Sequence, residues 1–373
     1  MHPLANVNSK GVLFVAKSNY IEISKAALDH NAAAITEAVS VPVIGVVKCD
    51  GYGVTLAEAA AAWERAGATM LAVSRPEEAT NLRKMGYRKD ILLLAPVADG
   101  DTLAEMLNND VILTVTSFQN AQFYSLYSFG RSPRVHIAID TGMGRFGIRC
   151  TDTEQIQAVY FLAGLRFEGI FSHFSRSFEG KYRYTKLQLE HFLLVTDALQ
   201  AAGFPVGLRH IANTNAALRF PETRLDAVRI GSGLVGISCS DLELVSVKKN
   251  YAQVVECRLL SPGERIGYGG HCVIRECTKA IVVSLGKMDG FGEVTVPEPL
   301  RLRNFLSYLW RVVKMRRHPP CVIYQGKRLL MLGQVGNQHT LFDATGTDIR
   351  PGDMVLWEGS LMTGRSQRKI IEN

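Results

Sequence analysis

Short runs of apolar residues alternate with segments rich in alanine and glutamate through the first two thirds of the chain. Eight of these runs are rich in Val, Ile and Leu with little polar alternation, which is typical of parallel strands covered on both faces. The predicted strands are 41–48, 69–74, 90–96, 111–117, 134–140, 167–174, 208–213 and 227–236. Between them, segments such as 56–66 and 75–85 predict helices, the second with Pro and acids in its first turn.

The spacing of these elements predicts a closed barrel. Strand starts recur about every 27 residues, and eight strand–helix units at that spacing are typical of a (β/α)₈ barrel. An open, doubly wound sheet is the alternative, but no G-x-G-x-x-G turn follows the first strand, which disfavours it. We therefore predict an α/β fold with a TIM-type barrel over residues 1–250.

A different pattern follows residue 250. Short strands separated by Gly, Pro and charged turns predict a mostly-β domain over residues 251–373, and a strand near 18–24 is expected to pack with it. An amphipathic helix near 300–315 interrupts these strands, with one apolar stripe and a basic opposite face. A surface helix packed on its own domain is favoured over a membrane-surface role. The predicted strands are 252–260, 270–275, 280–285, 321–324, 329–335, 339–343 and 354–357.

Composition narrows the class of protein. The chain is 47% hydrophobic and 21% charged, close to the globular average, which excludes a disordered or fibrous chain. No apolar run is long enough for a membrane span and no secretory signal is visible, so a cytoplasmic location is expected. The net charge of +7 reflects one local basic segment, so no nucleic-acid partner is expected. The seven cysteines form no C-x-x-C pair, so no metal site is expected.

Lys48 closes the first apolar run, where a barrel strand is expected to end. Active sites of barrels lie at this carboxyl-terminal mouth. A lysine in a largely apolar site has a lowered pKa and can form a Schiff base with a carbonyl group. From the spacing alone, it is an equally good interpretation that Lys48 only extends its ammonium group from the end of the barrel into water.

Further polar groups follow the later strands. Arg145 lies in a glycine-rich turn after the fifth strand and offers a fork for a carboxylate, and His173 follows the sixth. Thr214 after the seventh strand and the Gly-Ser-Gly turn at 231–233 after the eighth lie where barrels commonly bind phosphate. Together these groups favour an enzyme that uses a phosphorylated aldehyde cofactor.

Three segments resemble signatures of the bacterial alanine racemase family, which depends on pyridoxal 5′-phosphate. They are residues 46–53, 139–147 and 212–231, and the resemblance extends over about residues 18–290. It implies a barrel followed by a β domain. It also implies a homodimer whose active sites take residues from both subunits.

The resemblance assigns roles around the cofactor. Lys48 would hold it covalently, and Arg229, supported by His173, would face its pyridine nitrogen. An arginine there keeps its proton, which leaves the ring unprotonated and limits side reactions. The phosphate would be held by Tyr52, Thr214, Gly231 and Ser232.

The resemblance also implies a racemase with two bases. Lys48 and Tyr268, the latter from the partner subunit, would exchange the Cα proton on opposite faces of the substrate. Arg145 would orient the substrate carboxylate and Tyr268, whose pKa must be lowered by its neighbours. One alternative is a lyase or decarboxylase with the same cofactor, against which Tyr268 argues. Another is a cofactor-binding protein without turnover, against which the C-terminal domain argues.

The substrate side departs from the family pattern. Ala138 replaces a lysine that often supports the arginine at position 145. Lys287 stands where the family has a tyrosine, and Asn337 lies in a turn that replaces a cysteine–methionine–aspartate turn. The chain also ends without the family's late tyrosine near the phosphate. We therefore expect Lys287 and Asn337 to bind the substrate. We also expect a larger polar or acidic amino acid to be preferred to alanine, although the sequence does not show which one.

Overall fold

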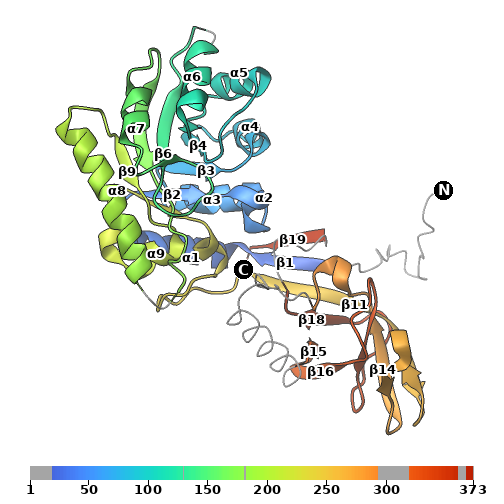
Figure 1. Cartoon of the computed structure of the whole chain (residues 1–373). Helices are drawn as coiled ribbons and strands as arrows, with labels where there is room; N and C mark the ends of the chain where they lie inside the picture. The colour runs from blue at the N-terminus through green and yellow to red at the C-terminus, as the bar shows by residue number, and fades with distance from the viewer. Residues whose placement is uncertain (1–18, 129, 180–181, 293–318, 360–366, 373) are drawn as a thin grey trace. The chain divides into compact units, whose positions relative to one another are not determined.

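The structure is a computed structural model that describes residues 19–128, 130–179, 182–292, 319–359 and 367–372 (Figure 1). The chain divides into two compact units. The first runs from Ser24 to Val247 and includes Glu372, and the second combines the residues up to Ile23 with Lys248–Ile371. The predicted helix near 300–315 lies outside the described residues.

The first unit is built on eight parallel strands that form a closed ring. Two parallel sheets have the orders β10-β2-β3-β4 and β5-β6-β8-β9. Parallel bridges from Leu92 to Ile112 and from His210 to Ala227 join the two sheets on both sides. The predicted (β/α)₈ barrel is therefore confirmed. Its strands are β2 (Val43–Val46), β3 (Met70–Val73), β4 (Asp90–Leu93), β5 (Leu113–Val115), β6 (Arg134–Asp140), β8 (Arg166–Phe171), β9 (Leu208–His210) and β10 (Val228–Ile230), and the short β7 (Ile148–Arg149) pairs with β6.

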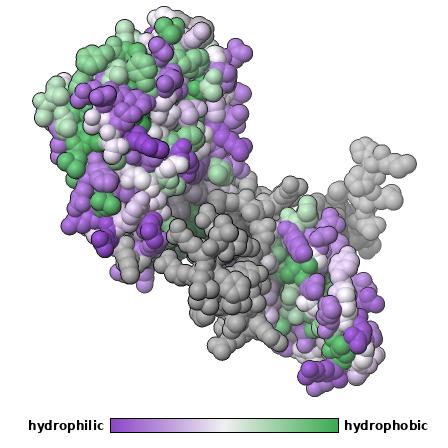
Figure 2. All heavy atoms as spheres, viewed as in Figure 1, coloured by the Kyte–Doolittle hydropathy of each residue, from purple (hydrophilic) through white to green (hydrophobic). Residues whose placement is uncertain are grey.

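Helices connect these strands and surround them on the outside (Figure 1). Several begin at a capping side chain, as at Asp99, which accepts the N–H of Thr102 at 2.8 Å. Hydrophilic and hydrophobic residues are mixed on the face of this unit seen in Figure 2. The helices are α1 (Lys25–Val39), α2 (Lys48–Tyr52), α3 (Leu56–Arg65), α4 (Pro76–Lys84), α5 (Gly100–Asn108), α6 (Phe118–Leu126), α7 (Thr153–Tyr160), α8 (Arg183–Ala201) and α9 (Thr214–Arg219).

Several barrel strands end earlier than their apolar runs predicted. β2 ends at Val46 rather than at residue 48, and β10 ends at Ile230, after which Ser232–Val235 forms a 3₁₀ turn, η2. The apolar composition continues because the turns are themselves buried: Val47 and Leu234 are 0% exposed. Burial, and not strand geometry, therefore set the length of these runs.

The second unit is an antiparallel β structure. An eight-stranded sheet has the order β14-β17-β16-β15-β18-β11-β1-β19, and β11 also pairs with β14, which closes part of the sheet on itself. β1 (Tyr20–Ser24) pairs with the start of β11, and apolar side chains such as Phe342 and Trp357 form the core. The other strands are β11 (Lys248–Leu260), β14 (Thr278–Val283), β15 (Cys321–Tyr324), β16 (Lys327–Leu332), β17 (Thr340–Asp343), β18 (Met354–Trp357) and β19 (Gln367–Ile371), with a hairpin of β12 (Arg265–Ile266) and β13 (Cys272–Val273).

Candidate active site

A cavity of ≈ 500 Å³ opens beyond the carboxyl ends of the barrel strands. Its lining contains four cationic side chains and no carboxylate, so it suits an anionic ligand. The cations are Lys48, Arg75, Arg145 and Arg229. The lining also brings together the sequence-predicted residues Tyr52, His173, Thr214, Gly231 and Ser232.

Lys48 is presented by an unusual turn, not by the strand that the sequence predicted. It begins α2, and the four residues from Cys49 to Tyr52 have φ between 52° and 65°, the left-handed region. This conformation costs about 1–2 kcal/mol for each non-glycine residue, so other contacts must stabilise it. The Glu78 carboxylate accepts the Cys49 N–H at 2.7 Å and two N–H groups at the start of α4 at 3.0 and 3.1 Å. Glu78 therefore joins the turn that carries Lys48 to the next strand–helix unit.

The surroundings of Lys48 favour its neutral amine. Burial lowers the pKa of Lys48, and the positive charge of Arg145 lowers it further, against a weaker opposing effect of Glu78. A neutral amine is the nucleophilic form that condenses with an aldehyde. Lys48 is thus the lysine in the cavity that can hold an aldehyde cofactor.

Hydroxyl and backbone donors meet at a second part of the cavity. Thr214 Oγ1, at the start of α9, accepts the N–H of Gly231 at 3.2 Å and that of Gly233 at 3.4 Å. A Cβ at position 231 would overlap the Tyr52 hydroxyl, so this close approach requires glycine. Burial raises the pKa of Tyr52 to about 12, which keeps its phenol protonated as a donor. With Ser232 beside them, the hydroxyl groups of Tyr52 and Thr214 can donate to a phosphate group.

Arg229 on β10 is 4% exposed, and neutral partners hold it. Its guanidinium donates to His210 Nδ1 at 2.7 Å, to His173 Nδ1 at 3.2 Å and to the backbone carbonyls of His210, Ile211 and Ser172. Burial and Arg145 lower the pKa of Arg229 to about 9, so it remains a cation at neutral pH. Burial and the nearby cations lower the pKa of His173 to about 3, which keeps this imidazole a neutral acceptor.

A buried polar network supports the strand end that carries His173. Gln188 on α8 is 0% exposed and donates to the His173 carbonyl at 3.2 Å and to Thr141 Oγ1 at 3.3 Å. Thr141 Oγ1 in turn lies 2.8 Å from Ser172 Oγ. No local motif in the sequence marks Gln188, Glu78 or His210. For Gln188 and His210 the signal available was a polar side chain at a buried position, whereas Glu78 shows only as an acid in the first turn of α4.

Arg145 lies in an ordered turn beside the cavity. The Asp140 carboxylate at the end of β6 accepts the N–H groups of Gly142, Met143 and Gly144 at 2.9, 2.9 and 3.0 Å. The Arg145 side chain lines the cavity together with Ala138 on β6. The methyl group of Ala138 offers Arg145 no charged partner. The turn therefore places a guanidinium at the cavity, where it can reach an anionic substrate group.

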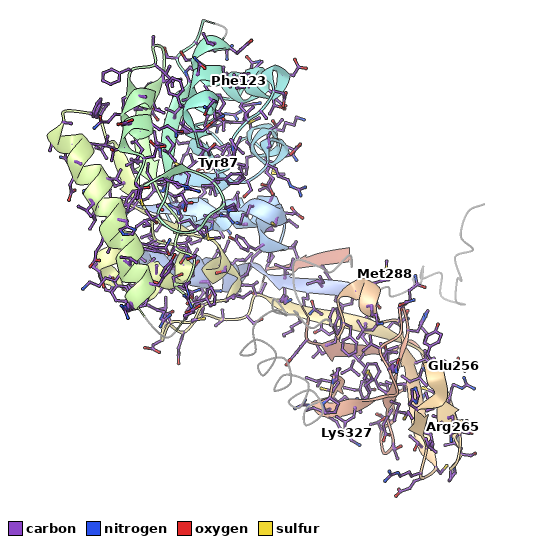
Figure 3. The ribbon with its side chains drawn as sticks, viewed as in Figure 1. Tyr87, Phe123, Glu256, Arg265, Met288 and Lys327 are labelled. Carbon is purple, nitrogen blue, oxygen red and sulfur yellow. The ribbon has the colours of Figure 1, made fainter. Side chains whose placement is uncertain are left out.

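The remaining three predicted residues belong to the second unit. Tyr268 lies between β12 and β13, is 79% exposed and is flanked by Gly267 and Gly269, whose φ angles are 73° and 74°. Lys287 donates its backbone N–H to the Gly336 carbonyl at 2.9 Å, which brings it beside the turn that contains Asn337. Figure 3 shows the labelled Met288 and Arg265, neighbours of Lys287 and Tyr268 in the sequence, at separate parts of this unit.

Two features are absent from the described part of the chain. Within the ranges that the structure describes, no helix is long and apolar enough to cross a membrane. Within the same ranges, no group of three or more His, Cys, Asp or Glu side chains could hold a metal ion.

Comparisons with known proteins agree with this geometry. The family profile "Alanine racemase, N-terminal domain" matches residues 23–239. The alanine racemase of Desulforamulus reducens is 36% identical over 285 residues, which are 73% of this chain and 76% of that protein. That of Desulfosudis oleivorans is 31% identical over 365 residues, covering 92% and 88%. The structure of an alanine racemase from Clostridium difficile 630 superposes with a TM-score of 0.82 at 25% identity, covering 96% and 97%.

These matches bear on the predictions from sequence. The resemblance and the fold, a TIM-type barrel followed by a β domain, are confirmed. The predicted enzyme class, an amino-acid racemase that uses pyridoxal 5′-phosphate, is confirmed at the level of the family. This chain belongs to the alanine racemase family.

Proposed function

We propose that this protein is a pyridoxal 5′-phosphate-dependent amino-acid racemase in which Lys48 and Tyr268 are the two bases. The observation that carries the proposal is one cavity that joins a lysine of lowered pKa, the hydroxyl groups of Tyr52, Thr214 and Ser232, and a buried arginine. The cofactor, when bound, withdraws electrons from the substrate Cα and makes its proton acidic.

The barrel residues fit this cofactor by their chemistry. Lys48 would hold its aldehyde carbon covalently, and the donors of Tyr52, Thr214 and Ser232 with the backbone at Gly231 would bind its phosphate. Arg229 would face the pyridine nitrogen as a donor that keeps its own proton. The acid-free lining of the cavity matches the negative charge of the phosphate and of a substrate carboxylate.

Proton transfer requires a base on each face of Cα. Lys48 would remove or return the proton on one face, and Tyr268 would act on the other. We propose that Tyr268 acts in the active site of a partner subunit within a homodimer, which is consistent with its 79% exposure in a single chain. Arg145 would orient the substrate carboxylate and that phenol.

The identity of the amino acid rests on the second unit. The two relatives described above are both named alanine racemase. Lys287 and the turn around Asn337 lie against each other, and we propose that they contact the substrate and favour a larger polar or acidic amino acid over alanine. The product would be the D-enantiomer. We also propose a cytoplasmic location, because all seven cysteines are unpaired, as is usual in a reducing compartment.

Two measurements test the proposal. Borohydride reduction of the protein with bound cofactor, followed by peptide mapping, should label Lys48. Incubation with L-alanine, serine, glutamate, aspartate, lysine and ornithine in D₂O should introduce deuterium at Cα of at least one of them, with loss of optical activity. Label on a different lysine would overturn the assignment of Lys48. Deuterium uptake without racemisation, or carbon dioxide release instead, would replace the racemase by another reaction.

A further inference from the structure

We infer that His136, which lies outside the cavity lining, is a positioning residue: it accepts the Nε2–H of His210 and so holds that ring where its Nδ1 accepts from Arg229 beside the cofactor. This inference rests on the proposed function of Arg229. Its structural part, the tautomer of His210, can be measured in the protein without cofactor.

A line of three side chains carries the inference. Arg229 Nη1 lies 2.7 Å from His210 Nδ1, and His210 Nε2 lies 2.9 Å from His136 Nδ1. The three residues come from the strands β10, β9 and β6 of the barrel. They are 4%, 0% and 1% exposed, so water does not compete for these hydrogen bonds.

The direction of each hydrogen bond follows from the chemistry of arginine. A guanidinium has donors and no acceptor, so His210 Nδ1 must accept. Burial and neighbouring positive charge lower the pKa of His210 and His136, which keeps both rings neutral with one proton each. The proton of His210 is therefore on Nε2 and is donated to His136 Nδ1. The opposite tautomer of His210 would direct one N–H at another across 2.7 Å.

Packing prevents the rings from turning to other partners. Phe171 stacks on His210 with ring centroids 5.1 Å apart and planes at 10°. The Arg229 guanidinium lies over the same Phe171 ring at 5.1 Å. The backbone of Gly169 lies against His136, since a Cβ there would come within 2.6 Å of its Cε1. The two imidazoles therefore keep the orientations that the relay of hydrogen bonds requires.

Loss of the acceptor on His136 would act on Arg229 through His210. Without it, the buried Nε2–H of His210 has no acceptor, while Arg229 still requires His210 Nδ1 to accept, so the ring cannot respond by moving its proton. The unpaired Nε2–H destabilises the position of the ring from which Nδ1 holds the Arg229 guanidinium. His136 thus contributes an acceptor, and the relevant property is this single lone pair.

Two substitutions separate the acceptor from the bulk of the side chain. His136→Asn places an amide oxygen near the position of Nδ1, while His136→Leu fills similar space without an acceptor. His30, exposed on α1, provides the matched control His30→Leu. Nitrogen NMR of ¹⁵N-histidine-labelled protein, with the signal of His210 assigned through His210→Gln, reports the tautomer. Cofactor affinity follows from fluorescence titration with pyridoxal 5′-phosphate.

We expect His210 to carry its proton on Nε2 in the unmodified protein, in His30→Leu and in His136→Asn. In His136→Leu we expect the same tautomer, with its Nε2–H left without a partner, and cofactor binding weakened by about tenfold, the size of one lost hydrogen bond. An Nδ1–H form in the unmodified protein overturns the inference even if the leucine variant does not fold. Equal weakening by asparagine and leucine overturns it as well. Failure of the proposed function would look different: no cofactor binding by the unmodified protein, with the His210 tautomer as described.

Discussion

Arg229 of the first unit, here called the barrel unit, is buried, whereas Tyr268 of the second unit, here called the β unit, is exposed. In the barrel, Arg229 is 4% exposed and is bonded through buried histidines to neighbouring strands. In the β unit, Tyr268 is 79% exposed on a hairpin rich in glycine. The groups proposed to hold the cofactor are fixed by contacts within one chain, whereas the proposed role of Tyr268 in a second subunit requires its side chain to be accessible.

The match to the N-terminal domain of the family has the same boundary, while the matches to whole alanine racemases extend through the β unit. The family profile covers residues 23–239, which corresponds to the barrel unit of Ser24–Val247. Of the residues predicted from sequence to depart from the family pattern on the substrate side, Lys287 and Asn337 lie in the β unit and Ala138 lies in the barrel. The same cofactor can serve different substrates, so residues around the substrate can change while the cofactor site is kept.

Removal of the lysine gives the largest expected effect and tests the barrel half. Lys48→Ala should reduce racemisation by about 10³-fold or more, because it removes both the covalent attachment and one base. Racemisation rates by circular dichroism check this, with Lys84→Ala on the exposed end of α4 as the control. Full activity in Lys48→Ala would show that the barrel cavity does not carry the chemistry.

Tyr268 tests whether the two halves act across subunits. Tyr268→Phe should lower the racemisation rate by about 10²–10⁴-fold, the usual contribution of a general acid or base. Mixing it with Lys48→Ala should restore about a quarter of the activity, since half of randomly formed dimers are hybrids with one intact site. Tyr127→Phe, at another exposed tyrosine, controls for loss of a surface hydroxyl. Hybrid dimers without activity would place Tyr268 in its own chain's site or outside catalysis.

The buried histidines predict how the barrel responds to pH. Burial, with Arg134 and Arg229 nearby, lowers the pKa of His136 to about 3, below its value in the unfolded chain. Below pH 6.5 the unfolded chain therefore binds a proton that the folded chain does not, and stability falls as pH falls. At pH 5 this single group would cost about 2 kcal/mol in the free energy of unfolding.

Urea unfolding of the cofactor-free protein at pH 7 and pH 5 measures this effect. His136→Asn should lose less stability between the two pH values than the unmodified protein, by about 2 kcal/mol. His30→Asn, at an exposed position, should leave the pH dependence unchanged. An unchanged pH dependence in His136→Asn would contradict the burial of a neutral imidazole.

Substrate preference gives the smallest expected effect and tests the β half. Lys287→Tyr should shift kcat/KM toward alanine by about tenfold relative to acidic and larger polar amino acids, because it removes a cation and restores bulk. Competition assays with alanine and glutamate check the shift, and Lys327→Tyr, on an exposed strand of the same unit, is the control. If the unmodified protein already racemises alanine fastest, the departure at Lys287 does not set specificity.

Local patterns in the sequence were sufficient for much of the barrel. The apolar run at 134–140 corresponds residue for residue to β6, and Pro76 with its acidic neighbours begins α4 as predicted. The motif around Lys48 and the Gly-Ser-Gly turn pointed to the same cavity. Such features depend on side-chain periodicity and on backbone freedom within a few residues, which a single sequence displays directly.

Non-local contacts decided the rest. β1 pairs with β11 across more than 200 residues of sequence, and Glu78 holds the turn of Lys48 from the next strand–helix unit. The sequence shows His136 and His210 only as polar residues in apolar runs. The barrel places His136 Nδ1 and His210 Nε2 at a distance of 2.9 Å. A hydrophobic pattern indicates which face of a strand is buried. The partner of a buried polar atom depends instead on how the strands close into a barrel, and closure of the barrel involves the whole unit.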